Sequence, residues 1–80
     1  MYEKLKDSRK VVGTRRLIRA IQAGEVSEVY LAGDADLFIV RQVKDAAAQA
    51  GLRVVQVDTK KELGALCGVE VKTAAAGILR

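Results

Sequence analysis

The sequence contains no histidine, no proline and no tryptophan, and it has a single cysteine, Cys67. Without histidine, the Ser-His-Asp and Cys-His arrangements of nucleophilic enzymes are excluded. One thiol and no imidazole are too few ligands for a zinc site. No other cofactor is predicted, because the glycine turn at Gly13 lacks the further glycines of a dinucleotide fingerprint and the lysine of a phosphate-binding loop. We therefore do not expect an enzyme.

Long apolar runs, low-complexity tracts and internal repeats are also missing from the 80 residues. No run approaches the roughly 18 apolar residues of a membrane span, and the charged start, MYEKLKDSRK, does not resemble a signal peptide. A lone cysteine cannot form a disulfide within the chain, which favours a reducing compartment. We expect residues 1–80 to form one domain, cytoplasmic and monomeric.

Positive charge is abundant only at the start of the chain. Residues 1–19 hold seven basic and two acidic residues, a net charge of +5, whereas residues 20–80 have a net charge of −1. The overall charge of +4 therefore comes from the first quarter of the sequence. Such asymmetry indicates an anion-binding face, although a solvated basic face without a partner is the alternative.

Helical and strand patterns alternate along the chain. Thr14 is a typical N-cap residue and Gly24 a typical helix stop, and Asp34 or Asp36 is expected to cap the long third helix. This order predicts an α/β fold, a three-layer α/β/α sandwich with a mixed four-stranded sheet. The predicted helices cover about residues 2–8, 14–24, 34–51 and 59–68, and the predicted strands cover 10–13, 26–33, 52–58 and 72 onward.

The helix from residue 14 has three arginines near its start. At about 100° per residue, its apolar residues fall on one side and Arg15, Arg16 and Arg19 on the other. Cations at a helix N-terminus are unfavourable because the helix dipole is positive there. A bound anion explains them, whereas a solvated helix face is the plainer alternative. Arginine suits bidentate recognition of phosphates and guanine edges.

Aromatic residues are few. Tyr30 and Phe38 are expected in the core, which argues against a platform on which the bases of single strands would stack. A structured RNA, recognised by its shape and by a few base edges, fits the arginines better.

Other candidate groups have structural interpretations that we favour. The two carboxylates of GDAD are more typical of helix capping than of catalysis or metal binding. Cys67 lies in an apolar helical context and is expected to be a small buried side chain rather than a reactive thiol. Gly33 is expected to permit a tight bend, and Gly64, inside a helix, to mark close packing.

The order of these segments resembles a known family. The stretch VVGTRRLIRAIQAGEVSEVYLAGDAD, followed by VVQVDTKKELGALCGVEVKTAAAGI, is similar to the L7Ae family of kink-turn-binding ribosomal proteins, above all to its small bacterial YbxF-type members. The resemblance implies an α/β/α sandwich that grips a sharply bent RNA loop with tandem sheared G·A pairs. It also implies a structured RNA, of the ribosome or of a riboswitch, as the partner.

The resemblance also implies three RNA-binding segments. The helix start would enter the groove at the G·A pairs, the turn before the last strand would cover the extruded bases, and the GDAD segment would line the site. Relatives have Asn-Glu or Lys-Gln where this chain has two arginines. The residues are Gly13, Thr14, Arg15, Arg16 and Arg19; Val69, Glu70 and Val71; and Gly33, Asp34, Ala35 and Asp36.

Other functions remain open from the residues alone. The chain is compatible with binding to another feature of ribosomal or transfer RNA, or to structured RNA without kink specificity. It is also compatible with a protein-interaction module that presents the acidic residues of the later segments. An RNA-modifying enzyme is disfavoured, because 80 residues leave no room for a cofactor domain.

Overall fold

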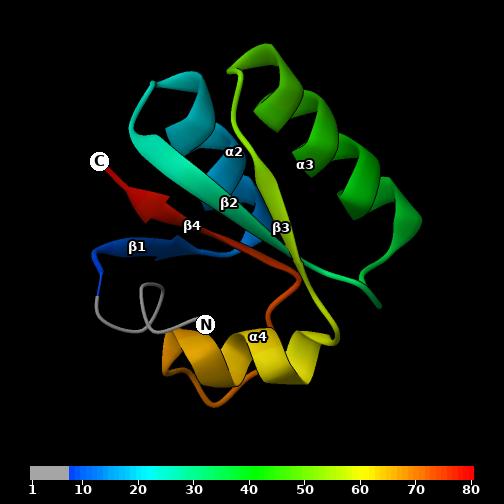
Figure 1. Cartoon of the computed structure of the whole chain (residues 1–80). Coiled ribbons are helices and arrows are strands. Elements are labelled where there is room, and N and C mark those ends of the chain that lie inside the picture. Colours follow the sequence, from blue (N-terminus) through cyan, green and yellow to red (C-terminus); the bar gives the residue numbers. More distant parts are fainter. Residues whose placement is uncertain (1–7) are drawn as a thin grey trace.

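The computed structural model describes residues 8–80 (Figure 1). The helix predicted over residues 2–8 therefore lies, apart from its last residue, outside the described range. None of the helices within that range is long and apolar enough to cross a membrane. The elements are β1 (Lys10–Val12), α2 (Thr14–Gln22), β2 (Val26–Ala32), α3 (Leu37–Gln49), β3 (Val54–Val57), α4 (Lys60–Cys67) and β4 (Ala75–Leu79).

The four strands form one sheet in the order β1-β4-β2-β3. Strand β2 pairs with β3 in parallel, and β4 pairs with both β1 and β2 in antiparallel register. Strands β1, β2 and β3 therefore run in the same direction. Their carboxyl ends meet the beginning of β4 at one end of the sheet, which we call the carboxyl end.

The sheet is covered on both faces, which confirms the predicted three-layer α/β/α sandwich. Successive residues of β2 point to opposite sides, as the period of a strand requires. Val29 and Leu31 pack with residues of α2 and α3, whereas Tyr30 and Ala32 pack with residues of α4. Figure 1 shows α2 and α3 together on one side of the strands and α4 alone on the other.

On each face of the sheet, the helices pack through apolar side chains that the helical period places on their inner side. Leu17 of α2, Val43 of α3 and Leu63 of α4 are completely buried. Full burial of such a side chain contributes about 1.5–3 kcal/mol. Cys67 is also buried, as predicted.

Two of the helix starts are capped as the sequence predicts. Asp36 accepts a hydrogen bond from the amide of Phe38 at 2.8 Å, and Thr59 accepts one from Glu62 at 3.0 Å. The prediction for Thr14 is wrong: the N-cap position of α2 is Gly13, and no side chain of the described residues caps this helix. Asp34 does not cap α3 but accepts from the amide of Lys60, the first residue of α4, at 2.7 Å.

Two strands begin later than predicted, because neighbouring backbone groups form other hydrogen bonds. The amide of Leu52 donates to Ala47 at the end of α3, so β3 begins only at Val54. The amide of Thr73 donates to Lys60 in the first turn of α4, and β4 begins at Ala75 instead of residue 72.

Two glycines permit close packing. A Cβ atom on Gly64 would collide with the carbonyl oxygen of Val71, which confirms the predicted close approach. Gly33 lies in a tight turn, as predicted: the amide of Ala35 donates to the carbonyl oxygen of Ala32 at 3.2 Å, and the φ of Gly33 is not positive. A Cβ there would lie 2.9 Å from Nε2 of Gln56 and 3.0 Å from the carbonyl oxygen of Asp58, so Gly33 lets β3 pass closely.

Candidate functional site

Hydrogen bonds bring the ends of β1 and β2 together around the segment that enters β4. The amide of Gly13 donates to the carbonyl oxygen of Ala75 at 3.1 Å, and that of Ala32 donates to Ala74 at 2.9 Å. The turn before α2 and the loop of residues 33–36 therefore flank the same short stretch of backbone. The carboxyl end of the sheet thus brings together two of the three predicted segments, the helix start from residue 13 and the GDAD segment of residues 33–36.

The start of α2 carries exposed positive charge at this end of the sheet. Gly13 has a φ of 107°, a backbone conformation that residues with a side chain rarely adopt. No atom of residues 8–80 would lie within 4 Å of an added Cβ. The first turn of α2 contains no acidic residue, and the side chains of Arg15, Arg16 and Arg19 are exposed. Backbone amides of a first helical turn have no partner inside the helix. Free amides, the helix dipole and the two first-turn cations, Arg15 and Arg16, therefore favour an anion at the same place, whereas Arg19 lies in the last turn of α2.

The apolar side of α2 explains why these arginines stay outside. Leu17, Ala20 and Ile21 are buried against the sheet and α3, as the helical period predicts. The arginines occupy the opposite side, so their charge is available without any cost to the core.

The carboxylates of the loop of residues 33–36 are structural. Asp36 caps α3 and Asp34 caps α4, so both use an oxygen to fix a helix start. This confirms the capping interpretation of GDAD. No group of three or more side chains within residues 8–80 is arranged to hold a metal ion.

The third predicted segment, residues 69–71, lies along α4. The carbonyl group of Val71 faces Gly64 in the middle of that helix, and Val69 packs against the core on this side of the sheet. The chain then returns to the first turn of α4, where the amide of Thr73 donates to Lys60 at 3.0 Å. Asp34 accepts a hydrogen bond from the amide of the same Lys60. Residues 69–71 and residues 33–36 are therefore connected through hydrogen bonds to one residue of α4.

Exposed apolar side chains lie in or directly after the predicted segments 69–71 and 33–36. Val71 is 69% exposed, Leu37 is 76% exposed and Phe38 is 68% exposed. The prediction that Phe38 belongs to the core is therefore wrong, whereas that for Tyr30 is confirmed, since it is buried. Leu37 and Phe38 are the first two residues of α3, and this end of the helix leaves them outside the core.

Phe38 is a candidate that the sequence interpretation missed. It lines an open groove between α2 and α3, together with Arg15, Ile18 and Arg19 from α2 and Ile39 and Gln42 from α3. The available signal was its position two residues after the N-cap Asp36, in the first turn of α3. The exposure of Phe38 was not predicted, because every residue of the apolar run LFIV is compatible with a position in the core.

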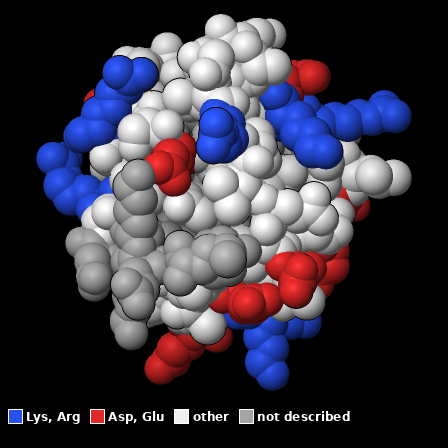
Figure 2. All heavy atoms as spheres, in the orientation of Figure 1, with Lys and Arg blue, Asp and Glu red and all other residues white. Residues whose placement is uncertain are grey.

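Basic side chains do not form one continuous patch on the face shown in Figure 2. They lie in separate groups, and most of the visible acidic side chains lie on the side where Figure 1 shows α4.

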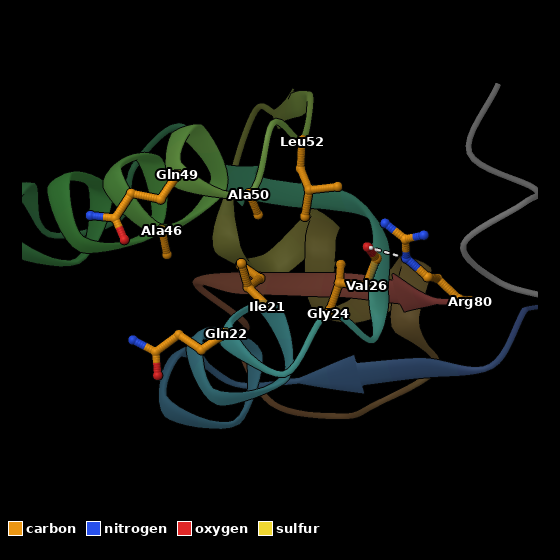
Figure 3. A pocket seen from close by; sticks show the side chains of 9 residues that line it. All are labelled: Ile21, Gln22, Gly24, Val26, Ala46, Gln49, Ala50, Leu52 and Arg80. Atoms are coloured by element: carbon orange, nitrogen blue, oxygen red, sulfur yellow. Dashed lines mark hydrogen bonds between the residues drawn. The ribbon is translucent and has the colours of Figure 1, made fainter.

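A second hollow, of about 400 Å³, lies between the carboxyl ends of α2 and α3 (Figure 3). Arg80 closes one side of it, where Nε donates to the carbonyl oxygen of Val26 at 3.4 Å. None of the predicted site residues lines this hollow.

Comparison with known proteins shows the family of the chain. The ribosomal protein L7Ae/L30e/S12e/Gadd45 family matches residues 1–80. The chain belongs to this family. The resemblance inferred from the sequence is thus confirmed.

Relatives within the L7Ae family cover nearly the whole chain. The RNA-binding protein YbxF of Geobacillus stearothermophilus is 46% identical over 80 residues, which are 99% of this chain and 98% of that protein. The large ribosomal subunit protein eL8 of Halobacterium salinarum is 38% identical over 68 residues, 84% of this chain and 57% of that protein. The solved structure of a 15.5kD RNA binding protein of Giardia lamblia is 26% identical and covers 99% of this chain and 70% of that chain, with a TM-score of 0.91.

Proposed function

We propose that this L7Ae-family protein is a non-enzymatic RNA-binding protein that recognises kink-turn RNA and holds it in its bent form. The observation that carries the proposal is the uncapped start of α2 at the carboxyl end of the sheet, with exposed Arg15 and Arg16 in its first turn and exposed Arg19 further along the same helix. The names of the relatives, which describe RNA-binding proteins and a ribosomal protein, support RNA as the anion.

The first segment acts on the phosphates and on base edges. The free first-turn amides of Thr14, Arg15 and Arg16 bind a phosphate, and Arg15, Arg16 and Arg19 supply charge. A guanidinium fork also matches the O6 and N7 acceptors of guanine, which tandem G·A pairs present in a groove. Arg15 and Arg16 thereby replace the polar pair that relatives have at these positions.

The other two segments complete the site. The loop Gly33, Asp34, Ala35 and Asp36 lines it with backbone held in place by two helix caps. Val69, Glu70 and Val71 cover the extruded bases, for which the exposed side chain of Val71 supplies apolar surface.

The mechanism is a shift of population and involves no bond rearrangement. A free kink-turn RNA exchanges between extended and bent conformers, and a protein that binds only the bent one increases its share. Residues 1–80 act as one RNA-binding domain, as a monomer in the cytoplasm, on a ribosomal or riboswitch RNA.

Arginine variants test whether α2 is the site. Arg16→Ala and Arg19→Ala are compared with Arg53→Ala, an exposed arginine just before β3, at the opposite end of the sheet. Each α2 variant is expected to weaken RNA binding and to reduce the slope of log affinity against log salt by about one. Arg53→Ala is expected to have a much smaller effect. Equal effects of all three substitutions would show general charge attraction and contradict the site.

A further inference from the structure

Phe38 is unusual because it combines exposure with a fixed position. Its side chain is 68% exposed, yet its amide donates to the carboxylate of Asp36 at 2.8 Å, which fixes the first turn of α3. A single exposed apolar side chain is ordinary on a protein surface. What distinguishes Phe38 is therefore the composition of the groove around it.

The groove between α2 and α3 combines one aromatic ring with cations. Arg15 and Arg19 line it from α2, Ile18 and Ile39 contribute apolar surface, and its volume is about 630 Å³. None of the residues within 8–80 that line it is acidic. An aromatic ring beside guanidinium groups matches a nucleotide, whose base stacks on the ring while its phosphate meets the cations.

The groove is also continuous with the start of α2. Thr14 and Arg15 belong both to the segment proposed to hold the RNA and to the wall of the groove. An RNA bound at Gly13 therefore passes the opening of the groove. Paired bases inside a duplex present only their edges, so a base that stacks on Phe38 must be unpaired.

We propose that the groove between α2 and α3 binds an unpaired nucleotide of the RNA, with its base stacked on Phe38 and its phosphate held by Arg15 and Arg19. This inference rests on the proposed RNA-binding function and adds a subsite to it.

Tryptophan substitutions test the contact directly, because the chain contains no tryptophan. Phe38→Trp places a fluorophore in the groove, and Leu37→Trp places one at the neighbouring residue, which is 76% exposed and does not line the groove. On titration with a kink-turn RNA, the emission of Phe38→Trp is expected to be quenched by base stacking. That of Leu37→Trp is expected to change much less. Equal quenching of both would overturn the inference.

Affinity gives a second, independent measurement. Phe38→Ala and Phe38→Leu are expected to weaken binding of the same RNA on the order of tenfold, since both remove the ring. Leu37→Ala is the control and is expected to bind like the parent protein. Circular dichroism checks that each variant folds, which the exposure of both positions favours.

The outcomes separate the two proposals. If the parent protein binds the RNA and Phe38→Ala binds it equally well, the groove is not a subsite while the proposed function stands. If the parent does not bind RNA, both fail. A change in Phe38→Trp emission with protein concentration, without RNA, would show that a second copy of the chain occupies the groove and would overturn the inference.

Discussion

Oδ1 of Asp34 accepts a hydrogen bond from the backbone amide of Lys60 at 2.7 Å, so the loop after β2 caps the helix that begins 26 residues later. Through this bond, the segment that follows β2 and the segment that precedes β4 are held by the same helix start. The geometry of the carboxyl end of the sheet depends on it.

Removal of this cap is expected to destabilise the protein. Asp34→Ala should lower the free energy of unfolding by about 1 kcal/mol, the usual net contribution of one hydrogen bond, while Thr59 remains as the N-cap residue of α4. Asp34→Asn keeps an acceptor oxygen and should lose less. Urea denaturation measures both, with Asp45→Ala on the exposed side of α3 as the control. A loss as large for Asp45→Ala as for Asp34→Ala would contradict the role of the hydrogen bond.

Substitutions of two glycines, at opposite ends of α2, distinguish an effect on stability from an effect on RNA binding. Gly13 has a φ of 107° and Gly24 a φ of 74°, and an added Cβ would meet no atom within 4 Å at either position. Alanine at either site should therefore cost about 1–3 kcal/mol of stability through backbone strain alone. Only Gly13→Ala should also weaken RNA binding, because its methyl group would stand between the first-turn amides and a phosphate.

The comparison needs the unfolding free energy and the RNA affinity of both folded variants. If Gly24→Ala loses as much affinity as Gly13→Ala, the turn before α2 does not contact the RNA.

The buried thiol predicts a dependence of stability on alkaline pH. Burial raises the pKa of Cys67 above its ordinary value of 9.0, and the charge of Lys10 lowers it by a smaller amount. The folded protein thus holds the thiol proton more tightly than the unfolded chain. This stabilisation is complete below the pKa of the unfolded chain and is lost as the pH rises toward that of the folded state.

We therefore expect the stability advantage of the parent protein over Cys67→Ala to shrink as the pH rises above 9.0, the ordinary pKa of the thiol. Urea denaturation across a series of pH values measures the difference in unfolding free energy between the two proteins. Because lysines and tyrosines titrate in both proteins, their contribution cancels in this difference. A difference that stays constant would contradict the burial of the thiol.

Local signals predicted much of this fold correctly. Asp36 and Thr59 have short acceptor side chains directly before helical patterns, and Gly24 and Gly68 adopt the positive φ that ends a helix. Such signals depend on a few neighbouring residues. The buried side of α2 likewise follows from the helical period alone.

Other features depend on residues that are distant in the sequence. Asp34 precedes a helix, and only the fold shows that its carboxylate reaches a different helix. Gly33 is small because β3 passes beside it, and Phe38 is exposed because the core ends before the first turn of α3. Thr14 follows the capping preference but lies one residue inside α2. Arg15 and Arg16 stand out in the sequence, because a charge that opposes the helix dipole is visible without the fold, whereas Arg19 lies in the last turn of α2.

The most direct test of kink-turn recognition is a gel-shift titration at fixed salt with two RNAs. One is a kink-turn RNA, and the other is the same RNA with its tandem G·A pairs replaced by Watson–Crick pairs. Because the proposed site recognises the bent form and its G·A pairs, the intact RNA is expected to bind far more tightly. Equal binding of both RNAs would contradict kink-turn recognition and leave a general RNA-binding protein, and binding of neither would favour a protein partner.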